Sequence, residues 1–333
     1  MLASIKDVAR HAGVSVGTVS NVLNHPSRVS PETVDRVQQA ISTLGFVRND
    51  VARQLRAGTS KTVALIVMDA SNPFFADIAR GAEERANDMG LSVVTGNTAE
   101  SSQRESHYLD VFEEQRVRGL LLVSPVGPID ARLQELKDFG IPSVLVDRPS
   151  PDGAFSSVSV DDVAGGQTAI EHLLSIGRKN IAFVGGALDV PQVRDRLAGA
   201  RLALQDRPGT SLRVFETRAT TVLEGRRIGR EIDALPANER PDAVFAANDL
   251  VAIGFIQGLL TTRRLSIPDD IALVGYDDID FAASAIVPLT SIRQPSRQLG
   301  ETALEMLEAE VADPHTSPRA VEFQPELVIR SSA

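Results

Sequence analysis

The sequence predicts a small all-α headpiece containing a helix-turn-helix, followed by an α/β body of two similar parallel-sheet subdomains. Two observations lead to this fold class. The first 24 residues hold two short helical patterns separated by a glycine-centred turn. From residue 61 onward, short apolar runs alternate with helical stretches, which is typical of parallel β-α-β units. A chain of 333 residues has room for one small domain and one or two larger ones.

The first helix is predicted to begin at a capping box, because Ser4 is followed three residues later by Asp7. An apolar stripe with the helical period comes next. Gly13 then supplies the positive φ with which a helix ends in a sharp turn, and Val14 fills the gap before the second helix. The stripe consists of Ile5, Val8, Ala9 and Ala12.

Ser15 is expected to cap a second helix, from Val16 to Asn24, whose two faces differ in chemistry. One face is apolar, and the other carries short polar side chains that fit a DNA major groove. At its start, Val16 can touch a thymine methyl group and Gly17 lets the backbone approach the bases, while Asn21 can pair with an adenine edge or a phosphate. The predicted DNA contacts of this region are Ser4, Ser15, Val16, Gly17, Thr18, Ser20, Asn21 and Asn24.

A third helix completes the headpiece. Ser30 is expected to cap it, Pro31 takes its first position and Gly45 ends it. Its inward stripe consists of Val34, Val37, Ile41 and Leu44. An amphipathic helical hairpin without a DNA role is the alternative interpretation of the motif.

Residues 49–60 are predicted to form a hinge helix or linker between headpiece and body. Asn49 can cap a short helix that carries Ala52 and Leu55 and ends at Gly58. Such a helix is too short to be stable alone. The alternative is a plain linker in which Leu55 packs on the body.

Charge is distributed unevenly along the chain. Residues 1–60 contain seven basic and four acidic residues, whereas the remainder contains 27 basic and 40 acidic residues. A basic head on an acidic body favours phosphate contact by the head alone, with an affinity that falls as salt rises.

Other features of the sequence exclude several classes of protein. The chain has no cysteine, its start lacks the pattern of a signal peptide, and its apolar runs are too short to cross a bilayer. The five histidines are scattered, and neither a P-loop, a GxSxG nor an HExxH motif is present. We therefore expect a cytoplasmic protein without a membrane segment, catalytic residues, a metal site or a cofactor.

The body is predicted to consist of two lobes that face each other across a cleft. The strands of the first series cover residues 62–69, 91–97, 119–124 and 142–147, and those of the second cover 180–186, 212–217, 242–249 and 271–277. Strands near residues 160, 291 and 323 are the candidates for crossing between lobes. The predicted boundaries are 1–48 for the headpiece, 49–60 for the hinge and 61–333 for the body, with lobe 1 at about 61–160 and 292–322 and lobe 2 at about 161–291 and 323–333.

Polar residues that follow the predicted strands are candidates for binding a ligand in this cleft, because ligands of such sheets bind beyond the carboxyl ends of the strands. Carboxylates, amides and guanidinium groups suit a polyhydroxylated ligand, and an aromatic ring can cover its apolar face. The candidates are Asp69, Phe74, Phe75, Asp147, Arg148, Arg196, Asn248 and Asp277, followed by Ser124, Arg194 and Thr220. Helix capping is the alternative for an Asp or Asn after a strand, above all for Asp249 and Asp278, and the two phenylalanines can equally be core.

Several motifs in register resemble the LacI/GalR family of bacterial transcription regulators: IKDVARHAGVSVGTVSNVLN, NDVARQLRAG, DASNPFFADIARG, RLAGA, AANDLVAIG, VGYDD and PLTSIRQP. The resemblance implies a periplasmic-binding-protein-like body and favours Asp69, Asp147, Arg196, Asn248 and Asp277 as ligand contacts. It also implies that the hinge folds on DNA beside its copy from a second subunit, with Leu55 in the minor groove and Asn49 and Ala52 nearby. Asn21 departs from the family, since many members have arginine there, so the operator sequence stays open.

The predicted function is therefore that of a ligand-responsive, sequence-specific transcriptional regulator, expected to be a repressor. A homodimer would bind a near-palindromic operator in double-stranded DNA, and a small-molecule effector, a sugar or nucleoside, would change the setting of the lobes and the hinge. Whether the effector is an inducer or a corepressor stays open. The chain shows no terminal heptad repeat that would support a tetramer. The alternatives are a sugar-binding receptor without a DNA role and an enzyme that uses the cleft carboxylates.

Overall fold

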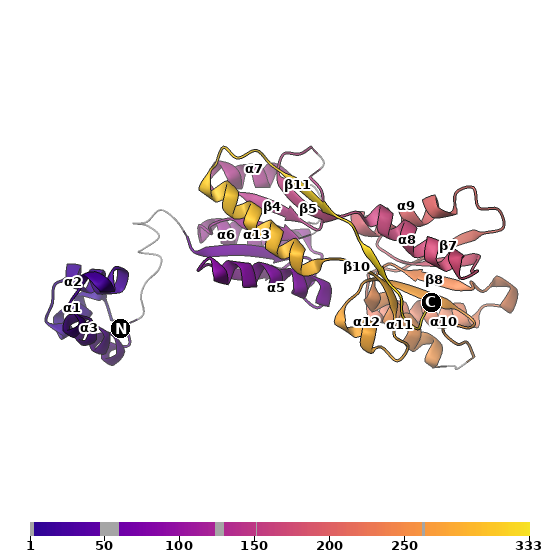
Figure 1. Ribbon diagram of the computed structural model, residues 1–333, viewed down its shortest axis with the longest axis horizontal. Helices are drawn as coiled ribbons and strands as arrows, with labels where there is room; N and C mark the ends of the chain where they lie inside the picture. The colour runs from indigo at the N-terminus through magenta and orange to yellow at the C-terminus, as the bar shows by residue number, and fades with distance from the viewer. Residues whose placement is uncertain (1–2, 47–59, 124–129, 151, 262–263) are drawn as a thin grey trace. The chain divides into compact units, whose positions relative to one another are not determined.

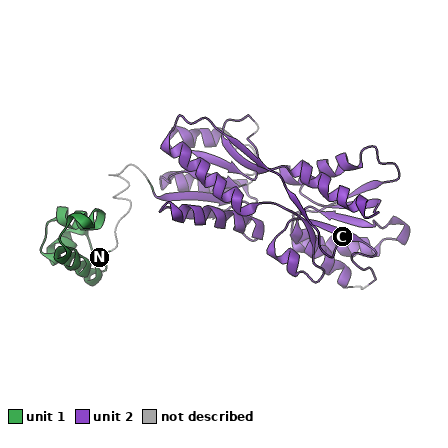
Figure 2. Cartoon of the chain, in the orientation of Figure 1, with its two compact units in different colours: residues 1–60 green, residues 61–333 purple. Residues whose placement is uncertain are grey.

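The computed structural model describes residues 3–46, 60–123, 130–150, 152–261 and 264–333. These residues belong to two compact units, residues 1–60 and residues 61–333 (Figure 2). The division between headpiece and hinge that we predicted at residue 48 lies outside the described residues and stays a prediction.

The first unit is the predicted three-helix headpiece. Ser4 accepts from the Asp7 backbone in the capping box, and Gly13 ends the first helix at φ 64°. The side chains of Val8, Val19 and Val37 are fully buried where the three helices meet. The helices are α1 (Ile5–Ala12), α2 (Val16–Asn24) and α3 (Pro31–Leu44), with a 3-10 turn η1 (Pro26–Arg28) before α3.

One predicted cap is wrong in its chemistry. Ser30 precedes α3, but its side chain makes no capping bond to the helix backbone and donates instead to Oγ1 of Thr33 at 2.9 Å. Ser15, by contrast, accepts from the Thr18 backbone N–H at 3.1 Å, as expected. Serine before a helix favours a cap, but the cap forms only when the serine side chain adopts a rotamer that faces the helix backbone and not a neighbouring hydroxyl.

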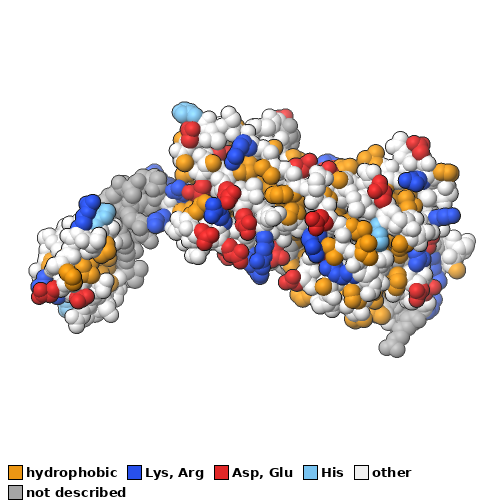
Figure 3. All heavy atoms as spheres, viewed as in Figure 1, with side chains coloured by type: hydrophobic (Ala, Val, Ile, Leu, Met, Phe, Trp, Pro, Cys, Tyr) orange, Lys and Arg blue, Asp and Glu red, His pale blue; other side chains and the backbone are white. Residues whose placement is uncertain are grey.

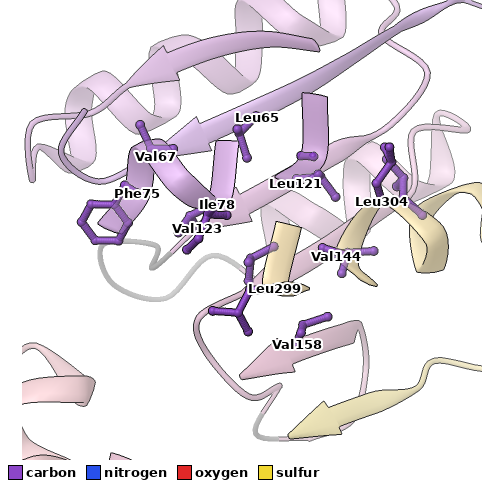
Figure 4. Packing of buried hydrophobic residues seen from close by; sticks show 14 of the residues in the cluster. Leu65, Val67, Phe75, Ile78, Leu121, Val123, Val144, Val158, Leu299 and Leu304 are labelled. Atoms are coloured by element: carbon purple, nitrogen blue, oxygen red, sulfur yellow. The ribbon is translucent and has the colours of Figure 1, made fainter. Parts of the chain in front are cut away.

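Lobe 1 of the second unit is built on a parallel sheet in the order β11-β5-β4-β3-β1-β2. Because its central strands are apolar on both faces, helices cover both sides. Helices α5 (Pro73–Asp88) and α13 (Ser296–Ala312) pack on one face, as Figure 4 shows, and α6 (Ser102–Glu114) and α7 (Asp130–Asp138) lie on the other. The strands are β1 (Thr62–Val67), β2 (Ser92–Asn97), β3 (Leu120–Val123), β4 (Ser143–Val146), β5 (Ser156–Val160) and β11 (Ala320–Phe323).

Lobe 2 repeats this plan in the order β12-β10-β9-β8-β6-β7, with only β12 antiparallel to its neighbour. Its helices are α8 (Asp162–Ser175) and α9 (Pro191–Leu204) on one face, and α10 (Val222–Ala234), α11 (Asp249–Leu260) and α12 (Asp280–Ser284) on the other, with a 3-10 turn η2 (Ala237–Glu239). The strands are β6 (Asn180–Gly185), β7 (Ser211–Glu216), β8 (Ala243–Ala246), β9 (Ala272–Asp277), β10 (Thr290–Arg293) and β12 (Glu326–Val328).

The chain passes three times between the lobes, after β5, β10 and β11 (Figure 1). Two of the predicted crossing points come slightly too early. Ile292 and Arg293 pair with β9 and so belong to lobe 2, whereas Phe323 pairs with β5 and belongs to lobe 1. After the second crossing, α13 packs on α5, although the two helices are far apart in sequence. An apolar pattern marks a strand, but it does not say which sheet the strand joins.

Three pairs of helices, α5 with α13, α8 with α9 and α10 with α11, cross where glycines allow close contact. A Cβ atom on Gly166 of α8 would lie 2.0 Å from the carbonyl oxygen of Arg196 in α9. Similar contacts involve Gly81 of α5 with Arg297, and Gly225 of α10 with Val251. The position of Arg196 therefore depends on a glycine that precedes it by thirty residues.

Replacing Gly166 with alanine is expected to destabilise the body by about 1–3 kcal/mol, because the added methyl group must displace the backbone of α9. Urea denaturation of the full chain measures this. The control is Gly17→Ala in α2, whose new Cβ would meet only Ser15 Oγ at 3.6 Å and should leave the headpiece as stable or slightly more so. Equal stability of Gly166→Ala and the unmodified protein would contradict the close crossing.

Candidate functional site

A cavity of about 40 Å³ lies between the two lobes, beyond the carboxyl ends of β1, β4, β8 and β9. Lobe 1 contributes Asn72, Phe74, Phe75, Glu100 and Asp147 to its wall, and lobe 2 contributes Gln192, Arg196, Thr220, Asn248 and Asp277. The wall combines hydrogen-bonding groups of both lobes with two aromatic rings. Space of this size holds only a few water molecules, so a larger ligand has to move the lobes apart.

Arg196 is the one basic side chain among the described residues that line this cavity. It is only 5% exposed, donates from Nε to Asp162 at 2.8 Å and from Nη1 to the Ala247 carbonyl at 2.7 Å, and stacks on the Tyr276 ring at 3.7 Å. Burial disfavours its charge, but the carboxylates of Asp162 and Asp277 outweigh burial and raise its pKa. The guanidinium is therefore a fixed positive charge in the wall.

Asp277 ends β9 and brings the two lobes into contact. Its backbone has φ 100°, and its Oδ1 lies 3.6 Å from Nη1 of Arg196. Gln294 donates to Oδ1 at 2.8 Å, and Asn72 of lobe 1 also hydrogen-bonds to this carboxylate. Burial is the largest influence on Asp277 and raises its pKa to about 6, against the opposing effect of Arg196. At neutral pH the carboxylate is ionised and accepts hydrogen bonds.

Asp147 is the second buried carboxylate of the cavity wall. It follows β4 with φ 59°, and Gln192 of α9 donates from Nε2 to its carbonyl oxygen and, at 3.2 Å, to Oδ2. Gln192 lies one helical turn before Arg196, so the same face of α9 presents both side chains to the cleft. This link joins lobe 1 to lobe 2 inside the cavity wall.

The surface of α2 in the headpiece is the candidate nucleic-acid interface. Ser15, Gly17, Asn21 and Asn24 are exposed, and Val16 is 42% exposed despite its apolar side chain. The other two predicted contacts on this helix are partly buried and bound within it, Thr18 to Ser15 at 2.9 Å and Ser20 to Asn24 at 3.2 Å. Ser4 is exposed at the start of α1. On the body, acidic and basic side chains are interspersed over the face that Figure 3 shows.

Family models match two parts of the chain. The model described as bacterial regulatory proteins, lacI family, matches residues 4–49, and the periplasmic binding protein-like domain matches residues 170–333. The ribose operon repressor of Escherichia coli is 34% identical over 334 residues, 100% of both chains. The HTH-type transcriptional repressor PurR of Photobacterium profundum is 33% identical over 340 residues, covering 99% of this chain and 98% of the relative. The chain belongs to the LacI family.

Solved structures agree with this assignment. The lac repressor dimer bound to operator and the anti-inducer ONPF has a TM-score of 0.85 at 27% identity, covering 100% of this chain and 99% of that one. A LacI-family regulator from Enterococcus faecium with bound ribose has a TM-score of 0.73 at 28% identity over 82% of this chain and 98% of that one. The predicted fold class and function are confirmed: the protein is a DNA-binding transcriptional repressor that responds to a small metabolite.

The relatives and the described residues also bear on other classes of function. Its curated relatives are transcriptional repressors rather than enzymes. Within the described ranges, no helix combines the length and apolar character that a membrane crossing requires. The same part of the chain contains no group of three or more His, Asp or Glu side chains arranged to hold a metal ion.

Seven of the predicted ligand contacts line the cavity: Phe74, Phe75, Asp147, Arg196, Thr220, Asn248 and Asp277. The two phenylalanine rings also pack in the lobe 1 core, edge to face with centroids 5.3 Å apart, as the core interpretation predicts, and their contact with a ligand stays a prediction. Asn248 caps α11 through the Val251 N–H at 2.9 Å and donates to the Thr220 carbonyl at 3.2 Å. Capping and a place in the wall are thus combined in one residue.

Other predicted residues lie elsewhere. The carboxylate of Asp69 accepts from the Ser71 backbone N–H at 2.9 Å and is not part of the wall, which contains Asn72 instead. Arg148 is half-buried outside the wall, and exposed Arg194 pairs with Asp195 at 3.1 Å. Ser124 and the hinge contacts Asn49, Ala52 and Leu55 lie outside the described residues.

Helix capping, the alternative interpretation of Asp249 and Asp278, is wrong for both residues. Buried Asp249 accepts from the Ile279 N–H at 2.9 Å and from Ser291 Oγ at 2.7 Å, while Asp278 forms ion pairs with arginines. Four further polar residues at or beside the cavity were not among the predicted contacts: Asn72, Glu100, Gln192 and Gln294. Gln192 could have been predicted, because it is a polar residue one helical turn before Arg196. No feature of the nearby sequence indicates that Gln294 binds Asp277.

The raised pKa of Asp277 predicts how stability depends on pH. A carboxyl whose pKa is 3.8 when unfolded and about 6 when folded holds its proton more tightly in the folded chain. Its contribution is complete below pH 3.8 and is lost as pH rises to about 6, by roughly 3 kcal/mol in total. We expect Asp277→Asn to remove this part of the pH profile of the unfolding free energy, and superimposable profiles would contradict the assignment.

Proposed function

We propose that the effector of this repressor is a monosaccharide of pentose size, with ribose as the leading candidate. The observation that carries the proposal is a single cavity wall in which Asp147 and Asp277 accept hydrogen bonds, Arg196 and Asn248 donate them, and Phe74 and Phe75 offer apolar ring faces. Sugar hydroxyls present donors and acceptors in several directions, and their C–H faces pack on aromatic rings.

The size and charge of the cavity narrow the ligand class. A cavity of about 40 Å³ has to expand less to hold one sugar ring than to hold two. Glu100, Asp147 and Asp277 oppose the single positive charge of Arg196, so the wall disfavours a phosphorylated ligand. The name of the Escherichia coli relative and the ribose in the Enterococcus faecium regulator support the same class.

We further infer that a homodimer binds operator DNA through two copies of the α2 surface and that sugar binding changes the hinge. The lac repressor dimer bound to operator supports this arrangement. Coupling between such sites amounts to about 1–3 kcal/mol, or about 5- to 150-fold in operator affinity. The protein would act in the cytoplasm, where its DNA lies, and the cleft carboxylates would hold the sugar without transforming it.

Calorimetric titration of the full chain tests the proposal with D-ribose, ribose 5-phosphate, cellobiose and adenosine. We expect D-ribose to bind, to raise the melting temperature with occupancy and to be recovered unchanged. Fluorescence anisotropy of labelled operator DNA, with and without the sugar, then measures the coupling. Binding of adenosine but not ribose would overturn the monosaccharide in favour of a nucleoside, and conversion of ribose would indicate an enzyme.

A further inference from the structure

The loop that carries Asp277 has an unfavourable backbone. Asp277 and the next residue, Asp278, both have positive φ, at 100° and 53°. Residues other than glycine rarely adopt this region, and two in succession persist only where surrounding contacts hold them. The contacts that hold this loop therefore also decide where the Asp277 carboxylate points.

The side chain of Asp278 forms two of these contacts. It is only 4% exposed and lies between two arginines, with Nε of Arg293 at 2.8 Å and Nη1 of Arg330 at 2.6 Å. The backbone is held as well, since the Asp278 N–H donates to Ser291 Oγ at 3.1 Å. Arg293 donates a charge-assisted hydrogen bond to Oδ2 of this carboxylate, and Arg330 adds an ion pair at Oδ1.

The two arginines belong to parts of lobe 2 that adjoin two of the interlobe crossings. Arg293 ends β10 and immediately precedes Gln294, which donates to Asp277. Arg330 follows β12, the strand after the third crossing, and also donates from Nη1 to the Leu289 carbonyl at 2.7 Å. The loop of the cavity carboxylate thus contacts lobe 2 residues that lie next to two of the three interlobe crossings.

We propose that Asp278, Arg293 and Arg330 form a positioning clamp that presets the Asp277 carboxylate for the effector. The proposal rests on the proposed function, because it assumes that a sugar binds at Asp277. Without the clamp, the backbone of Asp277 and Asp278 relaxes toward negative φ, and the Asp277 carboxylate no longer points toward the effector. Sugar binding then has to restore the strained backbone, which lowers the affinity. Preorganisation of this kind acts on affinity rather than on the contacts themselves.

The test compares D-ribose affinity in full-length Arg330→Gln and Arg293→Gln with a matched ion-pair control. The control is Arg264→Gln. In the unmodified protein the Arg264 guanidinium lies 2.7 Å from the carboxylate of Asp233, a residue of α10 whose side chain is only 1% exposed and lies outside the cavity wall. We expect the clamp variants to bind ribose about tenfold more weakly, while the control keeps its affinity at a similar loss of melting temperature. Arg330→Lys, which retains the charge, should recover part of the affinity.

Each outcome decides one of the two proposals. Ribose binding that is unchanged in both clamp variants overturns the clamp and leaves the proposed function standing. Equal weakening in the clamp variants and in Arg264→Gln reduces the effect to general stability and also overturns the clamp. Failure of the unmodified protein to bind ribose overturns the pentose assignment, and with it the clamp.

Discussion

Replacing Asp277 with alanine is expected to weaken effector binding by about 100-fold or more and to abolish the effector response, while operator binding persists. The variant loses a buried carboxylate that lines the cavity and receives bonds from Gln294 and Asn72. Arg196 keeps its partner Asp162 at 2.8 Å, so the wall does not acquire an unpaired charge. The residues expected to contact DNA belong to the other compact unit, residues 1–60.

Titration calorimetry with D-ribose and anisotropy of labelled operator DNA measure the two properties separately. The matched control is Asp69→Ala, since Asp69 follows β1 at the same edge of the body but lies outside the cavity wall. We expect its ribose affinity to stay within about threefold of the unmodified protein. Ribose binding of undiminished strength in Asp277→Ala would remove this residue from the site.

The Arg196→Met variant is expected to lose about 3–5 kcal/mol of unfolding free energy together with its effector response. The Arg196 guanidinium pairs with the buried carboxylates of Asp162 and Asp277. Removing the guanidinium therefore leaves both carboxylates without this cationic partner. Burial already raises the pKa of both carboxyls. The loss should therefore shrink at low pH, where protonated carboxyls need no partner.

Urea denaturation as a function of pH measures this effect. Arg194→Met is the control, because Arg194 belongs to the same helix but is exposed and pairs with neighbouring Asp195, so its loss should cost less than about 0.5 kcal/mol. The double variant Asp162→Asn/Arg196→Met should recover part of the stability. Additive losses in the double variant would show that the buried pair is not the source of the effect.

The headpiece was predictable because its signals are local. The capping box at Ser4 and Asp7 and the positive φ at Gly13 involve residues within one or two turns of each other, and the structure confirms them. Ser30 shows the limit of such signals. Its place before α3 was correct, but the choice between a backbone N–H and the Thr33 hydroxyl depended on rotamers that a sequence does not encode directly.

The cleft was predictable only in part. The position of a polar residue after a strand identified Asp147, Asn248 and Asp277, because parallel strands end at one edge of a sheet. The same signal applies equally to Asn248 and to the adjacent Asp249. Yet Asn248 caps a helix and lines the cavity, whereas Asp249 accepts a hydrogen bond from the backbone N–H of Ile279. Adjacent side chains in a helix point about 100° apart, and only packing decides what each one meets.

The sequence alone determined the order of helices and strands, the family and the chemistry available to the cleft, since periodicity, capping and strand ends depend on residues close along the chain. The tertiary structure decided which side chains that are distant in sequence meet. Gln192 reaches Asp147, Gln294 reaches Asp277, and Arg330 reaches Asp278, over separations of 45, 17 and 52 residues respectively. Such pairs form because three crossings bring distant segments together, and the geometry of a crossing arises from the packing of whole sheets and helices rather than from any local pattern.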